Sequence, residues 1–600
     1  MTGSKRIAVI DRELCNPKVT GYACQKACPV NRTGKDCITI SEDDGKPFID
    51  ESLCIGCGIC AKRCQRNAIT VVNLPEELRE MPVHRYGRNM FALFRLPVPK
   101  QKAVVGLIGP NGTGKSTVVN ILSGNMKPNT GLPGEEVPWK GIIERFRGTE
   151  LQSYMESLSG GSIRSAYKPQ HVDLIPGSWS GKAGELLRKA DQEGKLNDVV
   201  GSLGLGELME KHVKELSGGE LQLLAIGATI LRKADFYFFD EPSSYLDVQQ
   251  RLVAANEIRK LCREAVVMVV EHDLAVADYL ADYTHILYGK PGAFGIVSRP
   301  YGVRVGINTY LEGYIKEENV RFRAEPITFS QRAKPPEKDK LFMPFQGFVK
   351  KLGSFSLKTE PGNLYRGEVI GILGPNGTGK TTFIRMLAGL LRPDNAAGQG
   401  RTQAGAEGVR LSYKPQRLVL SRKEGRMAVQ EYLSGAGSLS GAGNKRVIRA
   451  LRLDKLLERK LENLSGGELQ ACLVAYALMK EHDLLLLDEP SAFLDVEQRL
   501  RVARLIREHA EVREIPCFVV DHDLQFIDVI SDRVMVFSGR RGVSGHAGPP
   551  SPLTEGMNSF LRALGVTFRR DPQTGRPRAN KPGSQKDSEQ RESGNFYYAA

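Results

Sequence analysis

The sequence has no uninterrupted run of about 18 apolar residues, which is the length that a membrane-spanning helix needs. Its first residues, MTGSKRIAVIDREL, lack the apolar core of a secretory signal. Motifs for a flavin or a nicotinamide cofactor are also missing. These absences argue against a membrane-spanning or secreted protein, and we expect a cytoplasmic protein with no membrane partner.

Acidic residues are outnumbered: the chain has 84 Lys and Arg against 69 Asp and Glu, a net charge of +15. An excess of this size suits a polyanionic partner such as RNA, DNA or anionic lipid, although it can also serve solubility alone. At 600 residues the chain is too long for one hydrophobic core, so we expect three or more domains.

Cysteine is scarce over most of the chain and concentrated near its start. Eight of the eleven cysteines lie within residues 15–64, whereas Cys262, Cys472 and Cys517 stand among apolar neighbours and are expected to be core thiols. A disulfide scaffold would spread its cysteines along the chain. Their clustering predicts a metal site instead.

The segment CIGCGICAKRC at 54–64 has the C-x2-C-x2-C-x3-C spacing of a [4Fe–4S] ligand run. Zinc, the competing metal, rarely uses three cysteines spaced this closely. Ligands cross over in two-cluster ferredoxins, so the last cysteine of the run is expected to bind the other cluster. One predicted cluster uses Cys28, Cys54, Cys57 and Cys60. The other uses Cys15, Cys24 and Cys64 with one more ligand.

Two segments of the remaining chain repeat each other. GPNGTGKST at 109–117 returns as GPNGTGKTT at 374–382, and LSGGELQ at 216–222 returns at 464–470. The shorter segments YKPQ, DEPSSYLDVQQRL and VVEHDL recur in the same order, the last two with small changes. The two copies therefore predict two similar domains.

The first copy carries about 19 extra residues before its YKPQ segment, located around 137–158. Apolar residues recur there at roughly helical intervals, and a Gly-Thr pair interrupts them. We interpret the segment as a helix–loop–helix insertion. Packing of a plain surface insertion on its own domain is an equally good alternative.

Each copy carries the chemistry of a nucleoside triphosphatase. GxxxxGK[ST] follows an apolar strand in both copies, and backbone N–H groups of such a loop cradle phosphates. Lys115 and Lys380 are expected to reach the β- and γ-phosphates. Asp240 and Asp488 end apolar strands and are predicted to bind the Mg²⁺ shell.

Four residues are predicted to be catalytic. Glu241 and Glu489 directly follow the Mg²⁺-binding aspartates and can polarise the attacking water as general bases. His272 and His522 end apolar strands, where an imidazole could reach the γ-phosphate. A lone histidine is usually structural, but two at matching positions in a repeat favour a functional role.

These segments resemble the Walker A, Q-loop, signature, Walker B, D-loop and H-loop motifs of ABC-type ATPase domains. In that family two domains pair head to tail, so that each signature faces the Walker A loop of the other domain. The resemblance implies two composite sites. One joins Lys115, Gln170, Glu241 and His272 with Ser465, Gly466 and Gly467; the other joins Lys380, Gln416, Glu489 and His522 with Ser217, Gly218 and Gly219.

Further residues are expected to contact ATP or Mg²⁺. Aromatic side chains upstream of each loop could stack on adenine: Tyr86 and Phe91 in the first copy, and Phe355 as a weaker candidate in the second. The remaining loop residues expected to bind the nucleotide and its Mg²⁺ are Gly109, Asn111, Gly112, Gly114, Ser116, Thr117, Gly374, Asn376, Gly377, Gly379, Thr381 and Thr382.

The whole chain resembles the RNase L inhibitor family, the ABC-type ribosome-recycling ATPases of archaea and eukaryotes. That resemblance rests on the iron–sulfur head joined to twin ABC domains and on several further stretches. These are NLPEEL at 73–78, HRYGRNMF at 84–91, FRGTELQSYMESL at 146–158, GINTYLEGY at 306–314 and FRRDPQTGRPRANK at 568–581.

The resemblance implies a multidomain α/β fold: a ferredoxin-like iron–sulfur domain (α+β) followed by two ABC-type P-loop ATPase domains arranged head to tail with hinge elements. Composition alone would leave residues 571–600 disordered, whereas the resemblance places FRRDPQTGRPRANK at 568–581 in a second hinge element, with only the last residues free. The expected boundaries are 1–75 for the head, 76–299 for the first ABC domain, 300–340 for a hinge, 341–545 for the second ABC domain and 546–600 for the C-terminal hinge element and tail.

The resemblance also implies a function. Such proteins hydrolyse ATP to split ribosomes into subunits, together with a release factor or a Pelota-type protein, and stay on the small subunit. The insertion at 137–158 would touch small-subunit rRNA. The expected cofactors are ATP, Mg²⁺ and two [4Fe–4S] clusters, which would stiffen a small domain that has little core of its own. We expect a monomer.

Two departures from the family pattern concern the cluster of Cys15, Cys24 and Cys64. Thr20 stands where the family usually has a cysteine, and Gln65 stands where a proline commonly follows the last cysteine. Cys37 could supply the missing ligand. Alternatively, one iron of that cluster lacks a protein ligand.

Other functions fit parts of the sequence. Twin fused ABC domains occur as soluble subunits of membrane transporters, but those lack eight clustered cysteines. A DNA-repair ATPase with a metal-bearing head would also suit the basic charge. A binding module with inactive sites is disfavoured, because both copies keep their Lys, Asp, Glu and His residues.

Overall fold

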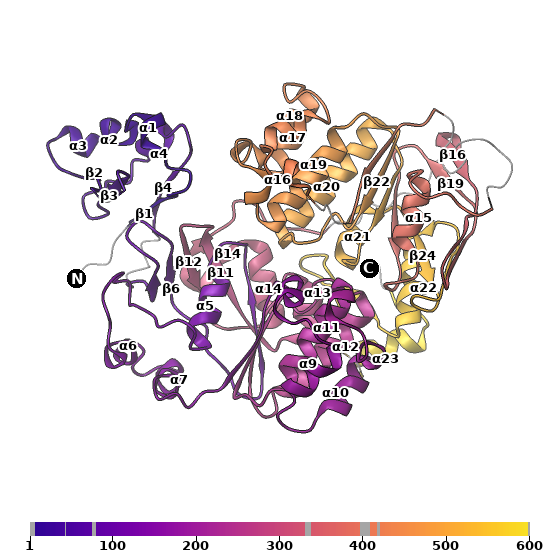
Figure 1. Cartoon of the computed structure of the whole chain (residues 1–600), viewed down its shortest axis with the longest axis horizontal. Coiled ribbons are helices and arrows are strands. Elements are labelled where there is room, and N and C mark those ends of the chain that lie inside the picture. The colour runs from indigo at the N-terminus through magenta and orange to yellow at the C-terminus, as the bar shows by residue number, and fades with distance from the viewer. Residues whose placement is uncertain are drawn as a thin grey trace.

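A cysteine-rich head and two similar α/β lobes make up the computed structural model, with the C-terminal segment running between the lobes (Figure 1). It describes residues 6–42, 44–74, 80–329, 338–395, 408–416, 420–581 and 583–597. The predicted boundary at residue 75, part of NLPEEL and residues 330–337 of the predicted hinge lie outside these ranges.

The head combines two short β-ribbons with short helices. Strands β1 (Arg6–Ile10) and β4 (Ile69–Asn73) pair antiparallel, as do β2 (Ile38–Ile40) and β3 (Pro47–Ile49). The helices are α1 (Pro17–Thr20), α2 (Ala23–Ala27), α3 (Pro29–Arg32) and α4 (Ile59–Arg63). Cysteine side chains form much of the small core that these elements enclose.

The first lobe is built on a nine-stranded mixed sheet. Its parallel part holds buried, almost wholly apolar strands, as expected for a sheet covered on both faces. The main path runs β5 (His84–Arg85), β6 (Ala92–Phe94), β12 (Phe294–Val297), β11 (Tyr283–Lys290), β7 (Val104–Ile108), β10 (Val266–Val270), β9 (Phe236–Asp240) and β8 (Ser165–Lys168).

Helices of the first lobe begin where the sequence supplies the right cap. α5 (Lys115–Leu122) follows Gly114, whose φ of +94° suits glycine, and α11 (Gly218–Ile230) is capped by Ser217, whose hydroxyl accepts the Glu220 N–H. The other helices are α8 (Ile175–Ser178), α9 (Ala183–Ala190), α10 (Leu196–Leu203), α12 (Val248–Leu261) and α13 (Leu274–Leu280).

The extra segment of the first copy forms α6 (Trp139–Arg145) and α7 (Glu150–Ser159), with Gly148 at a φ of +76° between them. Ile142 and Met155 are fully buried against the core of the same lobe. The Tyr154 hydroxyl donates to the Leu122 carbonyl at 2.6 Å. The two helices therefore pack firmly on their own domain through one face and leave the other exposed.

The second lobe repeats the first. Its sheet runs β17 (Val349–Leu352), β18 (Phe355–Thr359), β25 (Ser544–Ala547), β24 (Arg533–Ser538), β20 (Val369–Leu373), β23 (Cys517–Val520), β22 (Leu484–Asp488) and β21 (Leu411–Lys414). Its helices are α15 (Lys380–Leu387), α16 (Arg422–Gly425), α17 (Val429–Ser434), α18 (Ala442–Ala450), α19 (Gly466–Met479), α20 (Val496–Arg513) and α21 (Leu524–Ile530). A separate ribbon pairs β16 (Leu341–Phe345) with β19 (Gly362–Tyr365).

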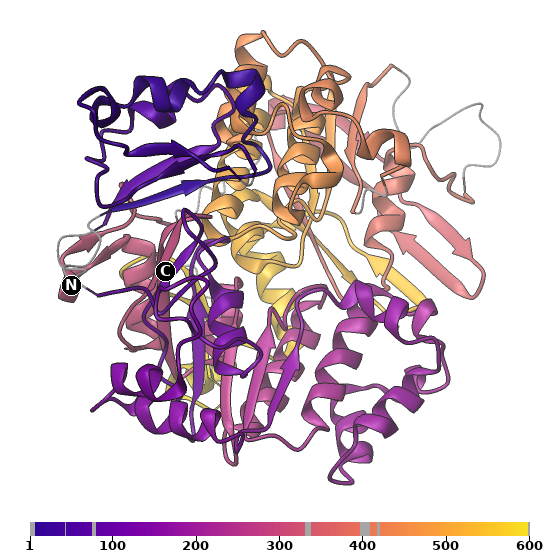
Figure 2. The same cartoon turned by 60° about the vertical axis from the view of Figure 1, so that its left-hand side comes forward.

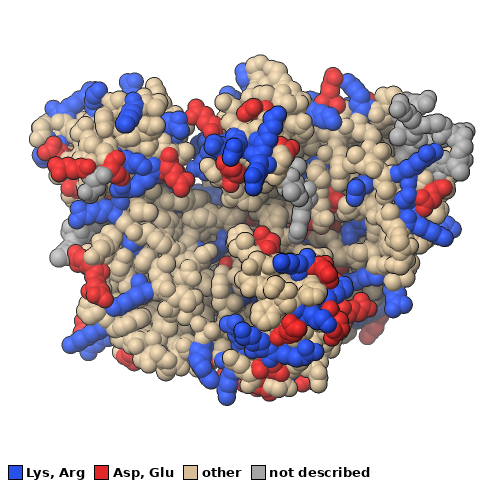
Figure 3. Space-filling model, viewed as in Figure 1, with Lys and Arg blue, Asp and Glu red and all other residues tan. Residues whose placement is uncertain are grey.

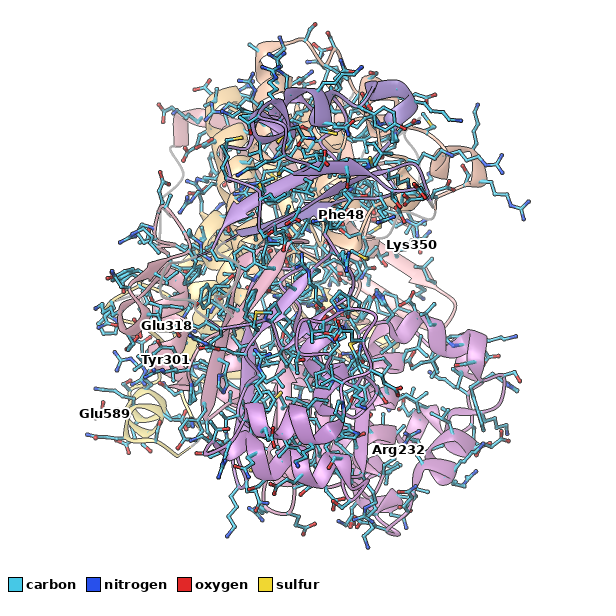
Figure 4. All side chains as sticks on the ribbon, turned by 90° about the vertical axis from the view of Figure 1, so that its left-hand side faces the viewer. Phe48, Arg232, Tyr301, Glu318, Lys350 and Glu589 are labelled. Carbon is cyan, nitrogen blue, oxygen red and sulfur yellow. The ribbon has the colours of Figure 1, made fainter. Side chains whose placement is uncertain are left out.

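Residues after the first ABC sheet fold back on that lobe. β13 (Tyr301–Gly302) pairs with β11, α14 (Val303–Glu312) follows, and β14 (Tyr314–Ile315) pairs with β15 (Val320–Arg321). Glu318 accepts a hydrogen bond from Tyr288 at 2.7 Å, and Tyr301 donates to Glu317 at 2.6 Å. Tyr301 and Glu318 lie on the same side of the molecule (Figure 4).

The described part of the C-terminal segment forms regular structure that bridges the two lobes. After β26 (Ser551–Pro552) and α22 (Leu553–Leu564), the hairpin of β27 (Phe568–Arg570) and β28 (Pro577–Ala579) leads to α23 (Gln585–Glu592). Composition alone suggests disorder here. The hairpin has few apolar residues to hold it in place. Its arginines instead pair with buried aspartates of both lobes, and these pairs fix its conformation.

The hairpin holds matching helices of the two lobes. Arg570 pairs with Asp528 of α21 at 2.6 Å, and the Arg578 guanidinium donates to Asp278 of α13 at 2.9 Å. Asp278 and Asp528 each lie six residues after the predicted catalytic histidine of their own copy. The last elements of the chain therefore connect the two candidate sites.

The described residues include no helix that is long and apolar enough to cross a bilayer. Lys and Arg side chains are mixed with Asp and Glu over the face shown in Figure 3, and a hollow separates the upper and lower parts of that face. The ferredoxin-like head followed by two ABC-type domains confirms the predicted fold class.

Candidate ATP sites and cysteine groups

Both predicted phosphate loops have the backbone that their sequence requires. Gly112 and Gly114 have φ values of +77° and +94°, and Gly377 and Gly379 have +74° and +96°. A β-carbon on Gly109 would stand 2.3 Å from the Leu287 carbonyl oxygen, so no other residue fits there. Each loop leads directly into a helix whose N-terminus favours an anion.

The loop lysines are buried and bond to carbonyl oxygens of their own loops. Lys115 Nζ donates to Gly109 at 2.9 Å, and Lys380 Nζ donates to Gly374 at 2.8 Å. Burial lowers the pKa of Lys380 to about 8, against the opposing effect of nearby carboxylates such as Glu489. Both ammonium groups are thus held at the mouth of the loop where phosphates would bind.

The two predicted Mg²⁺ ligands are buried aspartates. Burial and the adjacent glutamate raise the pKa of Asp240 to about 6 and that of Asp488 to about 7. Both carboxylate oxygens of Asp488 are buried without a hydrogen-bond partner. A divalent cation would supply the missing partner, so this donor set fits the Mg²⁺ that accompanies ATP.

Each predicted general base is surrounded by the polar groups expected from the sequence. Gln170 donates to Glu241 at 2.8 Å, and Gln416 donates to Glu489 at 2.6 Å. His272 and His522 place Nε2 3.4 Å from the carboxylates of Glu241 and Glu489, respectively. The structure therefore brings the glutamine, glutamate and histidine of each copy together.

His272 of the first copy and Glu489 of the second have shifted pKa values. Burial, followed by Lys115 and Arg499, lowers the pKa of His272 well below its usual value, and its buried Nε2 has no hydrogen-bond partner. Burial alone would raise the pKa of Glu489, but His522, Lys380 and Lys414 hold it at about 2. A charged carboxylate beside an imidazole can orient an attacking water next to a phosphate.

Residues from each copy reach into the site of the other. Asp247 accepts the backbone N–H of Asn376 at 2.9 Å, and Asp495 accepts that of Asn111 at 3.5 Å. Arg541 adds an ion pair to Asp247 at 2.7 Å. Asp247 and Asp495, which follow the predicted catalytic glutamates in the sequence, therefore each contact the phosphate loop of the opposite copy.

A second pair of contacts joins the predicted catalytic histidines across the interface. Arg251 donates to the carbonyl oxygen of His522 at 3.2 Å, and Arg499 donates to that of His272 at 3.4 Å. A pocket lined by both copies lies between these arginines, with Glu271 among its residues. Sequence reasoning missed these arginines and aspartates, although both lie in the repeated DEPS…LDV-QRL segment.

The two composite sites are not equally closed. A β-carbon on Gly219 would lie 3.7 Å from the Asn376 side chain, so this signature approaches the loop of Lys380. Among the described residues, no hydrogen bond joins Ser465, Gly466 or Gly467 to the loop of Lys115. The site around Lys380 is therefore the tighter one in this conformation.

The aromatic candidates lie beside the phosphate loops. Phe91 approaches Gly114 and Phe355 approaches Gly379, so the two phenylalanines occupy matching positions. Phe355 also packs against the core of the second lobe. Tyr86 is 46% exposed and its hydroxyl lies 3.1 Å from that of Thr117, which leaves its ring open to an adenine base.

The clustered cysteines form two groups of neighbouring thiols. Burial, followed by the nearby thiols Cys54, Cys57 and Cys28, raises the pKa of Cys60 to about 12. Burial and the thiols of Cys24 and Cys64 likewise raise the pKa of Cys15. Buried thiols that repel each other's negative charge need cationic metal to become thiolates, and this chemistry fits iron–sulfur clusters.

Cys37 belongs to the first group. It is 1% exposed, and burial with the neighbouring Cys28 and Cys54 raises its pKa to about 12. This position does not support Cys37 as the ligand missing at Thr20. Within the described ranges, no three His, Cys, Asp or Glu side chains converge on one metal-ion position, whereas a cubane binds each thiolate through a different iron.

The head rests against the second lobe (Figure 2). Arg459, just before α19, pairs with Asp11 of the head at 3.5 Å and with Glu468 at 3.9 Å. Arg66 of the head pairs with Glu458 at 3.7 Å. Glu468 lies in the first turn of α19, where its N–H donates to the capping hydroxyl of Ser465, so the head contacts the segment that carries the second signature.

Comparison with family models divides the chain as the fold does. The model described as "ABC transporter" matches residues 98–244 and 357–492, and "4Fe-4S binding domain" matches 47–70. A model described as "Possible Fer4-like domain in RNase L inhibitor, RLI" matches residues 6–36.

Similar proteins match over nearly the full chain. An uncharacterised ABC transporter ATP-binding protein of Methanocaldococcus jannaschii is 50% identical, over 99% of this chain and 97% of that protein. The translation initiation factor RLI1 of Chaetomium thermophilum is 44% identical over the same shares. A structure described as a model of ribosome-bound archaeal Pelota and ABCE1 is 50% identical, covers both chains fully and has a TM-score of 0.93.

Proposed function

We propose that this chain, which belongs to the RNase L inhibitor family, is an ATP hydrolase that splits ribosomes into subunits. It acts together with a release factor or a Pelota-type protein and stays on the small subunit. The observation that carries the proposal is the reciprocal contact of each copy with the other's phosphate loop, next to a head docked on one copy. Nucleotide binding at the interface can thereby move the head.

The residues of each copy divide the hydrolytic work. Lys115 and Lys380 would bind the phosphates. Asp240 and Asp488 would hold the Mg²⁺ that neutralises the negative charge of the phosphates. Glu241 and Glu489 orient and polarise the attacking water. His272 and His522 present Nε2 beside those carboxylates, where the γ-phosphate would lie.

Closure of the interface converts binding energy into motion. ATP at the site of Lys115 would draw Ser465 toward the first copy, and Ser465 caps helix α19, whose first turn carries Glu468, the partner of Arg459. Because Arg459 also pairs with Asp11 of the head, a shift of Ser465 and the start of α19 changes the surface on which the head rests. Hydrolysis then releases the two copies from each other.

Two [4Fe–4S] clusters complete the head in this proposal. Cys28, Cys54, Cys57 and Cys60 hold one cluster, and Cys15, Cys24 and Cys64 hold the other with one iron lacking a cysteine. The clusters serve as rigid cores, because the head encloses few apolar residues besides its cysteines. A stiff head can transmit force, which a loosely folded one cannot.

The partner surfaces follow from charge and exposure. Arg147 and Lys140 lie on the exposed side of the insertion and suit the phosphates of small-subunit rRNA. The net charge of +15 favours the same partner. A monomer in the cytoplasm would suffice, since the single chain supplies both halves of each composite site.

Sucrose-gradient sedimentation tests the function. Ribosomes incubated with a Pelota-type protein, ATP and the anaerobically purified chain should separate into subunits. The double variant Glu241→Gln, Glu489→Gln should bind small subunits with ATP but release them slowly. Ribosomes that stay intact with the active wild-type chain would overturn the proposal.

A further inference from the structure

The glutamates at both ATP sites have an unfavourable backbone conformation. Glu241 and Glu489 have φ values of +46° and +48°, in the left-handed region that residues other than glycine rarely adopt. Their N–H groups donate to the carbonyls of Val270 and Val520 at 2.9 and 2.8 Å. Such strain persists only where surrounding contacts determine the conformation, and it is common at active sites.

A buried lysine contacts the strained segment in each copy. Lys168 Nζ donates to the carbonyl oxygen of Asp240 at 2.8 Å and to that of Glu241 at 3.3 Å. In the second copy, Lys414 Nζ donates to the corresponding carbonyls of Asp488 and Glu489 at 2.8 and 2.9 Å. Lys168 is 0% and Lys414 is 1% exposed.

We propose that Lys168 and Lys414 are positioning residues, which hold the left-handed backbone of Glu241 and Glu489 so that each carboxylate faces the water that attacks ATP. Lys168 ends strand β8, two residues before Gln170, which bonds the Glu241 carboxylate at 2.8 Å. One short segment, YKPQ, therefore holds the glutamate at its carbonyl and at its carboxylate.

A glutamine from the signature helix completes this support. Gln222 Nε2 donates to the Glu241 carbonyl at 2.7 Å, and Gln470 Nε2 donates to the Glu489 carbonyl at 2.6 Å. Gln222 lies on α11, whose capping residue Ser217 belongs to the opposite composite site. Lysine and glutamine thus share one acceptor, and this arrangement is repeated in both copies.

Neutralisation of buried charge is the simpler role for such a lysine. Burial lowers the pKa of Lys168 to about 8, while Asp240, Glu241 and Glu271 act in the opposite direction. Charge neutralisation explains why a cation is buried here, but an ammonium group placed anywhere among the three carboxylates would provide it. It does not account for two ammonium–carbonyl bonds to the same two residues in each copy.

The inference rests on the proposed ATP hydrolysis and is tested by turnover without ribosomes. Glu489→Gln, used as the background, leaves hydrolysis to the site of Lys115. In that background Lys168→Met should lower kcat about 10- to 100-fold, because a small displacement of the catalytic carboxylate has a large effect. The dissociation constant for ATP should change less than about twofold, since the lysine does not touch the nucleotide loop.

Tyr237→Phe is the matched control, because it removes a hydrogen bond to Arg232 from the far end of the strand that carries Asp240. It should lower the melting temperature slightly and leave kcat unchanged. An unchanged kcat in Lys168→Met, or a parallel loss of ATP binding and turnover, would overturn the inference. Absence of turnover in the unmodified chain would instead refute the proposed ATP hydrolysis.

A double-mutant cycle with Gln222→Leu provides a second test. Both side chains act on the Glu241 carbonyl, so the combined loss of kcat should be smaller than the product of the single losses. Independent, multiplicative effects would show that the lysine acts elsewhere. Melting temperatures of all variants separate a loss of folding from a loss of positioning.

Discussion

At the scale of single residues, the five thiols of the first cysteine group exceed what one cubane needs. In the proposed cluster, Cys54, Cys57 and Cys60 supply the ligand run, and Cys28 completes it. Cys37 donates to the Asp50 carbonyl with a sulfur–oxygen distance of 3.9 Å, as a protonated thiol does. The sequence could not reveal that Cys37 lies beside these cysteines, because the position of Cys37 depends on how strand β2 lies next to the loop that carries Cys54.

Substitution of Cys37 separates ligands from neighbours. Cys37→Ser should keep the iron content and the visible absorbance of the anaerobically purified chain, because no iron depends on this thiol. Cys60→Ser should lose about half of the iron, as removal of a ligand opens one cluster. Iron assay and absorption spectra give the answer, and equal losses in both variants would make Cys37 a ligand.

A second residue-scale feature is a histidine pair found in only one copy. Nε2 of His509 lies 3.2 Å from Nε2 of His482, and the rings are stacked. Burial, followed by His482 and Arg513, lowers the pKa of His509 to about 3. The matching residues of the first copy are Ala234 and Leu261.

This pair should make the second lobe sensitive to acid. An unfolded histidine titrates near pH 6.5, so the unfolded state binds more protons than the folded state between pH 6.5 and about 3. The free energy of unfolding is therefore highest above pH 6.5 and decreases as the pH falls below it. Between pH 7 and pH 5, the free energy of unfolding should decrease by about 2 kcal/mol less in His509→Leu than in the wild type. Parallel denaturation curves for variant and wild type would contradict this.

At the scale of elements, local signals predicted the parts of each site that one copy supplies. Glycine spacing, apolar strands and the residues at their ends indicated the phosphate loops, carboxylates and histidines. Contacts made by Asp247 and Arg251 across the interface depend on how the copies pair, which no local pattern encodes. Composition also hid the C-terminal hairpin, which only the family resemblance indicated, because arginine–aspartate pairs rather than apolar residues hold it.

That hairpin should be essential for stability. Asp278 is 4% exposed and pairs with Arg576 and Arg578. Removing one partner of a buried ion pair costs about 3–5 kcal/mol, because the other charge is left without compensation. Asp278→Asn should therefore lower the unfolding free energy by about that amount in chemical denaturation. Glu589→Gln on the exposed face of helix α23 serves as the control and should leave the unfolding free energy nearly unchanged.

At the scale of the whole molecule, the docked head and the unequal ATP sites belong to one conformation. The tighter site uses Asp247 and Arg541, while the site that Ser465 would complete is still open. The head contacts the segment beside that open signature. Its contacts are partly exposed ion pairs, which are individually worth only about 0–1 kcal/mol. The contacts of the head with the second lobe are therefore weak enough for ATP-driven closure to break them, while contacts such as the Arg85–Glu51 ion pair keep the head on the first lobe.

Reversal of one of these charges should shift the head without affecting the catalytic residues. Arg459→Glu places one new carboxylate against those of Asp11 and Glu468, so the docked population should fall up to about fivefold. Fluorescence transfer between dyes on the head and on the second lobe would measure it. Asp11→Arg in the same chain restores opposite charges and should restore docking. If both variants dock like the wild type at low salt, these ion pairs do not hold the head, and its position comes instead from contacts with the first lobe such as the Arg85–Glu51 ion pair at 2.5 Å.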